Sequence, residues 1–187
     1  MNRRAAEKGF TLTELMTTVT IVGILASVAV VGVKEDREGD SARLVSNMSQ
    51  EARRRAISGG PVRTAVANAG WGTARTSLVY SVTAGQSAVS LFVLAEDPEP
   101  AVTASWELVR TLNLPRETAI AGVADAAFTS QGGVFATIVA PVTKRWFPDG
   151  TSEASTVFIK PSGDRNGTNY RVATLPLAGT PMLFSGW

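Results

Sequence analysis

Residues 8–33, KGFTLTELMTTVTIVGILASVAVVGV, constrain the interpretation of this chain more than any other segment. Within them, residues 15–33 are 19 consecutive positions without a charged side chain. At a rise of 1.5 Å per residue, a helix of that length covers roughly 28 Å, about the thickness of the hydrocarbon core of a bilayer. The sequence therefore predicts a membrane-spanning helix near the amino terminus.

The charges that precede the apolar stretch predict its direction. Arg3, Arg4 and Lys8 come before it, and positively charged flanks normally stay in the cytoplasm. The long remainder of the chain is therefore expected outside the cytoplasm. A secretory signal peptide is the alternative, with a cleavage site among the small residues at 26–29. Against it, the apolar stretch is longer than the core of a typical signal peptide and continues into a helical pattern.

Glu14 is a carboxylate at the start of this otherwise apolar helix. Ionisable groups inside a membrane are costly and usually have an assigned partner. One interpretation is local: residues 11–14, TLTE, fit the S/T-x-x-E capping box, in which the glutamate accepts a hydrogen bond from a free backbone N–H. The other is a partner on a second subunit, and the residues taken alone leave both open.

The string KGFTLTELM at residues 8–16 resembles the processing site of type IV prepilins and type II secretion pseudopilins. In these proteins a short basic leader ends in Gly and is followed by Phe-Thr-Leu-x-Glu and an apolar helix. The resemblance implies cleavage after Gly9 by a prepilin peptidase, N-methylation of the new terminus Phe10, and retention of the helix. It also implies that Glu14 acts in subunit assembly. A terminal ammonium packed in a filament core needs a counter-charge, because an unpaired buried ion costs several kcal/mol.

Residues 35–57 are predicted to continue as a second helical section. An apolar stripe runs along it at spacings of three and four, formed by Val45, Met48, Ala52 and Ala56. We expect this stripe to pack on the head, and residues 58–61, SGGP, to end the helix. The arginines at 53–55 are either a partner-binding patch or a solvated last turn, for which basic residues are favourable.

After Pro61 the sequence changes to short β-rich runs separated by Gly, Pro, Asn and Ser. Strands are predicted at 62–67, 77–82, 89–94, 105–112, 118–121, 134–139, 155–159 and 170–175. The hairpin-scale spacing implies antiparallel pairing, and the lack of a convincing long helix in this half argues against nucleotide-binding βαβ folds.

The predicted fold class is α+β, with a long N-terminal α-helix, first transmembrane and then amphipathic, packed on an antiparallel β head of two facing sheets. Four segments are expected. They are a leader peptide at 1–9, a transmembrane or filament-core helix at 10–33, a stalk helix at 34–58 and a head at 61–187.

Composition argues against catalysis. The chain has no Cys and no His, so it lacks thiolate ligands and the commonest general base and metal ligand. No cofactor and no metal site are expected. An anchored periplasmic enzyme would need a clustered acid and base, and no such motif is evident. The sequence therefore predicts a protein that is not an enzyme.

The charge distribution argues against a nucleic-acid partner. The net charge of +2 resides in residues 1–9, and their removal leaves 15 basic and 15 acidic side chains. The last twelve residues contain no Lys or Arg, whereas the DNA-uptake branch of the pilins is understood to use a basic C-terminal segment. A DNA-uptake pilin is therefore the less favoured interpretation.

Residues 146–150, WFPDG, are predicted to form a tight turn. Together with the strands after it, an Arg at position 171 and a final Gly-containing hairpin, this turn resembles the GspH and FimT/FimU minor pilins. The resemblance implies a priming or tip complex of a type IV pilus, with pilus assembly, adhesion or motility as its role. A minor pseudopilin of a type II secretion system is the alternative.

The family resemblance also implies partners and location. The partners are other minor and major pilins through the N-terminal helix, the prepilin peptidase and the inner-membrane assembly platform. The chain would be a single-pass protein of the bacterial inner membrane before assembly. It would then lie at a pilus tip or in a periplasmic pseudopilus.

Overall fold

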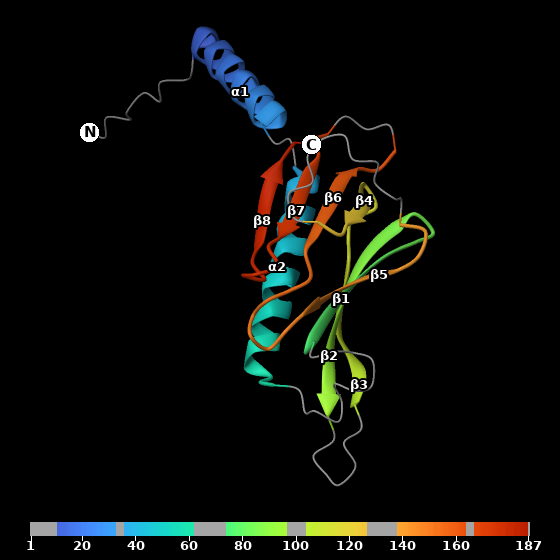
Figure 1. The fold of residues 1–187 in the computed structure, drawn as a ribbon. Coiled ribbons are helices and arrows are strands. Elements are labelled where there is room, and N and C mark those ends of the chain that lie inside the picture. The colour runs from blue at the N-terminus through green and yellow to red at the C-terminus, as the bar shows by residue number, and fades with distance from the viewer. Residues whose placement is uncertain are drawn as a thin grey trace, which may run out of the picture. The chain divides into compact units, whose positions relative to one another are not determined.

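The structure is a computed structural model that describes residues 11–32, 36–61, 74–96, 104–126, 138–163 and 167–186 (Figure 1). The chain divides into two compact units, Met1–Glu35 and Asp36–Trp187. Helix α1 (Leu12–Gly32) belongs to the first unit. Helix α2 (Arg37–Ser58) and every described strand belong to the second.

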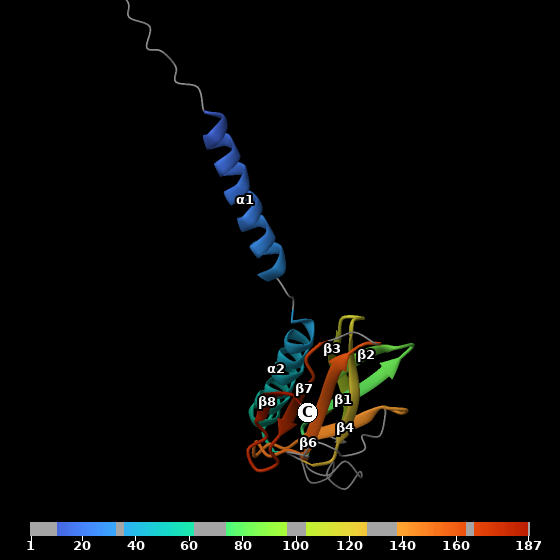
Figure 2. The ribbon, with the colours of Figure 1, turned by 90° about the horizontal axis from the view of Figure 1, so that it is seen from above.

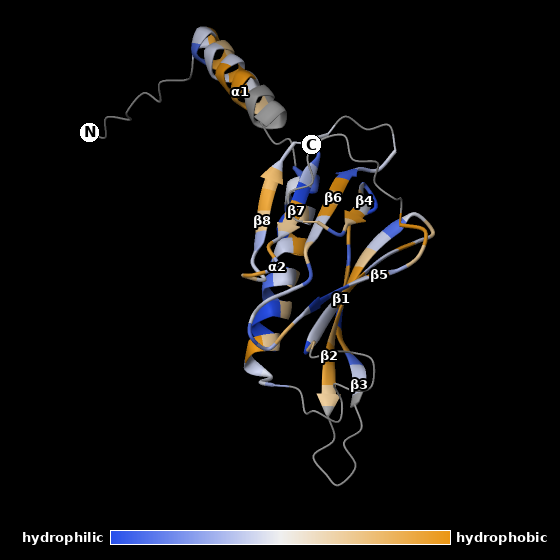
Figure 3. Cartoon of the chain, in the orientation of Figure 1, coloured by the Kyte–Doolittle hydropathy of each residue, from blue (hydrophilic) through white to orange (hydrophobic). Residues whose placement is uncertain are grey.

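Helix α1 is apolar around its whole circumference. Figure 3 shows a hydrophilic first turn in blue and mainly apolar residues in the turns that follow it. The side chains from Thr11 to Ala26 are exposed, so none of them is packed in a core. No helix in the described part of the chain is long and apolar enough to qualify as a membrane crossing.

Helix α2 begins and ends at identifiable caps. Asp36 has non-helical backbone angles, and its Oδ1 accepts a hydrogen bond from the Gly39 N–H at 3.0 Å. The helix therefore starts at Arg37, two residues later than predicted. At the other end the Gly59 N–H donates to the Arg55 carbonyl at 2.9 Å, and Gly60 has a φ of +68°. The predicted stop at 58–61 is confirmed.

The first sheet has the strand order β3-β2-β1-β5, and every neighbouring pair is antiparallel. Its strands are β1 (Thr76–Thr83), β2 (Gln86–Glu96), β3 (Ala104–Asn113) and β5 (Val142–Trp146). A two-residue loop joins β1 to β2, with φ of +50° at Ala84 and +78° at Gly85. Positive φ at both loop residues matches the twist of a tight hairpin.

The second sheet has the order β4-β6-β7-β8 and is also antiparallel throughout. Its strands are β4 (Thr118–Ala124), β6 (Ser155–Pro161), β7 (Tyr170–Thr174) and β8 (Pro181–Ser185). Helix α2 lies beside β7 and β8 in both Figures 1 and 2, and it also contacts strands of the first sheet. The predicted α+β fold with antiparallel sheets is confirmed.

The core of the second unit lies where α2 meets the two sheets. All four residues of the predicted stripe are buried, with Val45, Ala52 and Ala56 fully inaccessible and Met48 1% exposed. They pack in one cluster with side chains of both sheets, including Tyr80, Trp146 and Ile159. Since each sheet presents one apolar face to this helix, α2 holds the head together.

Two strands of the structure were not predicted, and the end of the strand predicted at 134–139 is wrong. Strands β5 and β8 fall outside the predicted ranges, whereas the other six strands overlap them. Residues 62–67 lie outside the described residues, as do 134–137, and Ile138 and Val139 are not in a strand. The segment boundaries predicted at 9/10 and 33/34 also lie outside the described residues.

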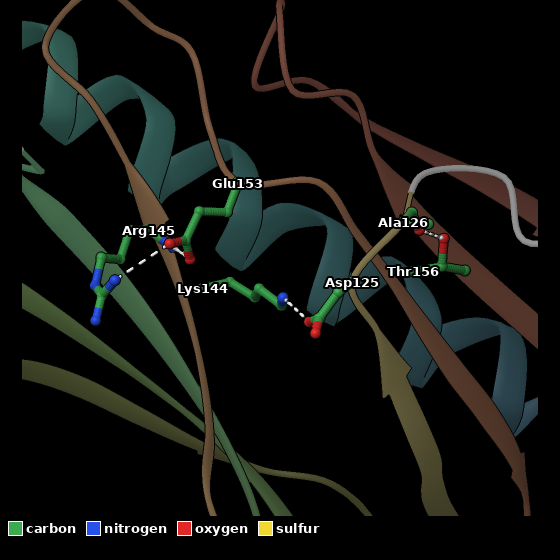
Figure 4. Close-up of polar contacts among 6 residues, drawn as sticks. All are labelled: Asp125, Ala126, Lys144, Arg145, Glu153 and Thr156. Carbon is green, nitrogen blue, oxygen red and sulfur yellow. Dashed lines mark hydrogen bonds and ion pairs between the residues drawn. The ribbon is translucent and has the colours of Figure 1, made fainter. Parts of the chain in front are cut away.

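A buried lysine explains why β5 was difficult to recognise. Figure 4 shows Lys144 of β5 paired with Asp125, which directly follows β4 of the other sheet. The Lys144 side chain is only 6% exposed, while that of Asp125 is 88% exposed. The pair therefore joins the two sheets, and a strand carrying an inward-pointing charge looks polar in the sequence.

Candidate functional site

The start of α1 is organised around Glu14 and Thr11. Oε2 of Glu14 accepts hydrogen bonds from the Thr11 backbone N–H and from its Oγ1, both at 2.9 Å. In return, the Glu14 N–H donates to Thr11 Oγ1 at 3.2 Å. These reciprocal bonds are a capping box, so the local interpretation of residues 11–14 is confirmed.

The capping box uses only part of the Glu14 carboxylate. Both bonds from Thr11 end on Oε2, and among the described residues no hydrogen bond to Oε1 is found. The residue itself is exposed. A carboxylate has about four lone-pair sites, so Oε1 can accept from another molecule while Oε2 still caps the helix. Capping and contact with a partner are therefore compatible at Glu14.

The threonines of α1 satisfy their own hydroxyl groups. Thr17, Thr18 and Thr20 each donate to the backbone carbonyl four residues earlier, at 2.7 Å in all three cases. A hydroxyl that is bonded within its own helix costs little when it enters an apolar environment. No role was predicted for these residues, although Thr within a helix is a signal for such bonds.

The exposed surface of α1 is thus apolar except at one end. Glu14 is the only charged residue from position 12 to position 32. The large exposed apolar side chains of α1 are Leu12, Leu15, Met16, Val19, Ile21, Val22, Ile24 and Leu25. A surface of this kind is suited to an apolar environment such as a bilayer or a bundle of similar helices, with one carboxylate available for recognition.

The other predicted site residues cannot be placed. Gly9 and Phe10 lie outside the described residues, so of the three predicted site residues only Glu14 has a defined environment. Within the described ranges no group of three or more acidic, His or Cys side chains is arranged to hold a metal ion.

In the head, the turn predicted at residues 146–150 is present. The Gly150 N–H donates to the Phe147 carbonyl at 2.9 Å, and Gly150 has a φ of +84°. The Asp149 carboxylate accepts from the backbone N–H and the Oγ1 of Thr151, and these bonds lower the pKa of Asp149. Trp146, at the start of the turn, is fully buried and donates from Nε1 to the Gly179 carbonyl.

Comparison with known families matches residues 4–30 to the prokaryotic N-terminal methylation motif. This motif is typical of type IV pilin-like and pseudopilin proteins, a family of structural subunits. It implies processing by a prepilin peptidase, assembly with other pilins, and membrane anchoring before assembly. Neither the comparison with curated proteins nor that with solved structures gave a match.

Proposed function

We propose that this chain is a minor pilin of the priming or tip complex of a type IV pilus. The observation that carries the proposal is the start of α1, where a single carboxylate stands on an exposed, otherwise apolar helix within the matched methylation motif. The minor role is supported by the resemblance of roughly the last 60 residues to the GspH and FimT/FimU minor pilins. A minor pseudopilin would share the processing and the helix.

Processing would create the positive charge that the Glu14 carboxylate of a neighbouring subunit can bind. Cleavage between Gly9 and Phe10 removes three of the basic residues and leaves a new ammonium at Phe10, four residues before Glu14. N-methylation of Phe10 keeps this positive charge. Since Oε2 of Glu14 is used by Thr11, the remaining Oε1 would accept a hydrogen bond from the terminal ammonium of a neighbouring subunit. This contact would set the axial register between two helices.

The proposal predicts a defined mature mass. Protein isolated from native membranes should lack residues 1–9 and carry one methyl group, which intact-mass spectrometry would detect. Retention of Met1, or a new terminus next to Ala29, would contradict the proposed processing and restore the signal-peptide interpretation.

The role of Glu14 can be separated from helix capping with two variants. Glu14→Gln keeps an oxygen that accepts from Thr11 but removes the negative charge, whereas Thr11→Val removes the capping hydroxyl and keeps the charge. We expect Glu14→Gln to be processed and stable in the membrane but missing from purified filaments. Thr11→Val should be incorporated. If Thr11→Val fails to be incorporated and Glu14→Gln succeeds, the carboxylate serves only as a cap.

The position within the assembly has its own test. An antibody against the head should label the ends of isolated filaments. Uniform labelling along the shaft would contradict a tip location. A strain that lacks this protein gives a further test. If it keeps its surface filaments but no longer secretes folded proteins, the pseudopilin alternative is correct.

A further inference from the structure

The exposed face of α2 forms one wall of a groove of about 310 Å³. Its polar lining consists of Asn47, Gln50, Glu51 and Arg54 of α2 together with Arg110 of β3. On a helix, positions 47, 50, 51 and 54 share one face. The apolar Leu44 and the buried Met48 complete the lining, so the groove runs along the flank of α2 between its exposed face and Arg110 of β3.

Arginines from two distant parts of the chain meet here around one acid. The Glu51 carboxylate pairs with Arg55 at 2.9 Å through Oε1 and with Arg110 at 3.7 Å through Oε2. An adjoining hollow of about 330 Å³ is lined by Glu51, Arg54, Arg55 and Ser58. Three guanidinium groups and a single carboxylate thus line the two hollows and leave a local charge of +2, although residues 10–187 carry equal numbers of acidic and basic side chains.

Arg54 differs from Arg55 and Arg110 in its ion pairing. Within the described ranges it forms no ion pair, whereas Glu51 holds both Arg55 and Arg110 in place. Glu51 is only 21% exposed and lies at the wall shared by the two hollows, so it orients these two guanidinium groups. A guanidinium that is exposed at the mouth of a groove can bind a carboxylate through two parallel N–H···O bonds.

We propose that this groove binds a carboxylate-bearing protein segment, namely an acidic stretch of a neighbouring subunit. Arg54 and Arg110 would bind one side-chain carboxylate, and the amides of Asn47 and Gln50 would pair with the backbone of the same segment. That the segment comes from another pilin rests on the proposed function, whereas binding of a carboxylate follows from the groove itself.

The same features disfavour a nucleic acid as the occupant. A phosphate backbone is bound by many cations along a stripe, and its affinity depends on the number of phosphates neutralised. Here the positive charge is confined to three side chains, with the Glu51 carboxylate among them.

The test is a titration of the full chain in detergent with a fluorescein-labelled hexaglutamate peptide. The variant Arg54→Gln/Arg110→Gln removes two positive charges from the groove. The control Lys160→Gln/Arg116→Gln removes two charges from exposed positions that do not line it. We expect the groove variant to lose about tenfold or more in affinity and the control to stay within about twofold of the wild type.

Three results would overturn the proposal. They are no binding of hexaglutamate by the wild type at low ionic strength, equal losses in the groove variant and the control, and tighter binding of a short DNA duplex than of the peptide with the same arginine dependence. The last result would assign the groove to nucleic acid. The titration requires no assembled filament, so a failure of the Glu14 experiment would leave its outcome unaffected.

Discussion

The two helices have nearly the same length and opposite surfaces. Helix α1 has 21 residues, is apolar on all sides, and exposes its described side chains up to Ala26. Helix α2 has 22 residues, buries one apolar stripe against two sheets, and exposes arginines on its other side. A helix that is hydrophobic all round belongs in a core or a membrane. Helix α2 packs within its own unit, whereas the side chains of α1 from Thr11 to Ala26 are exposed.

The N-terminal caps of α1 and α2 also differ in whether their partners are local or distant in the sequence. The cap of α1 is local, because the hydrogen bonds found among the described residues for the side chains of Thr11 and Glu14 all stay within residues 11–14. The cap of α2 reaches across the head, since the Asp36 carboxylate accepts from Gly39 through Oδ1 and from the Tyr170 hydroxyl through Oδ2. Tyr170 is the first residue of β7. The start of α2 is thereby tied to the second sheet, and its stability depends on the tertiary structure.

The largest effect should come from placing one charge at equivalent positions of the two helices. Val45 is fully buried in α2, whereas Val19 of α1 is 65% exposed. Val45→Asp puts an unpaired carboxylate into the core, and we expect it to lower the free energy of unfolding of the head by about 4 kcal/mol or more. Urea unfolding followed by tryptophan fluorescence measures this, since Trp146 is buried in the same core.

Val19→Asp is the matched control for this experiment. It should leave the unfolding of the head within about 0.5 kcal/mol of the wild type, because surface substitutions are usually that small. It should reduce the fraction of protein recovered with the membranes. Equal destabilisation of the head by both variants would show that α1 is part of the same folding unit, and the contrast between the helices would be lost.

A smaller and opposite pair of effects is expected at two glycines. A Cβ at Gly39 would lie 2.4 Å from Oδ2 of Asp36, so Gly39→Ala must displace the cap of α2. Loss of such a cap costs about 1 kcal/mol and displacement from Tyr170 adds about 0.5–1 kcal/mol, whereas Ala gains about 1 kcal/mol over Gly in a helix, so we expect a net loss of about 0.5–1 kcal/mol. Urea unfolding of the head checks this value.

Gly23→Ala tests the other helix. A Cβ at Gly23 meets nothing within 4 Å, and Ala is favoured over Gly in a helix by about 1 kcal/mol. The substitution should therefore raise the helix content of α1 in detergent, measured by circular dichroism of the full chain, and leave the head unchanged. Destabilisation by Gly23→Ala would mean that α1 is packed closely at this position.

The helices and most strands were predictable because their signals are local. A run without charge predicts α1, and spacings of three and four predict the buried face of α2. Strand β5 was missed because Lys144 and Arg145 make it look polar, and their partners Asp125 and Glu153 lie elsewhere in the sequence. Strand β8 was not among the predicted ranges because it begins with Pro181, although the final Gly-containing hairpin to which it belongs was recognised.

For the candidate sites as well, contacts within one helical turn could be predicted from the sequence, and contacts between distant residues could not. The capping box was predictable, since Thr11 and Glu14 are three residues apart and bond within one turn. The groove on α2 was not, because Arg110 reaches it only through the pairing of β3 with β2. The arginines at 53–55 were interpreted as either a partner-binding patch or a solvated last turn, and their sequence neighbours contain no sign that Arg110 joins them from a strand.

The smallest effect concerns the long-range cap of α2 and depends on pH. The hydrogen bond to Asp36 raises the pKa of Tyr170 above its ordinary value of 10.0, because ionising the tyrosine would place two negative charges together. The folded state thus holds this proton more tightly than the unfolded state. Its contribution to stability is complete below about pH 10 and is lost as the pH rises through the raised pKa of the folded state.

Tyr170→Phe removes this hydrogen bond while keeping the ring. Because Tyr170 is partly exposed, we expect a loss of about 0.5–1 kcal/mol at neutral pH, the usual range for one hydrogen bond. The difference between variant and wild type should shrink above pH 10, as the wild-type tyrosine ionises. Tyr80, whose pKa is also raised by burial, is present in both proteins and cancels in the difference. A difference that stays constant through pH 11 would show that Tyr170 stabilises α2 by packing alone, and the cap of α2 would then be as local as that of α1.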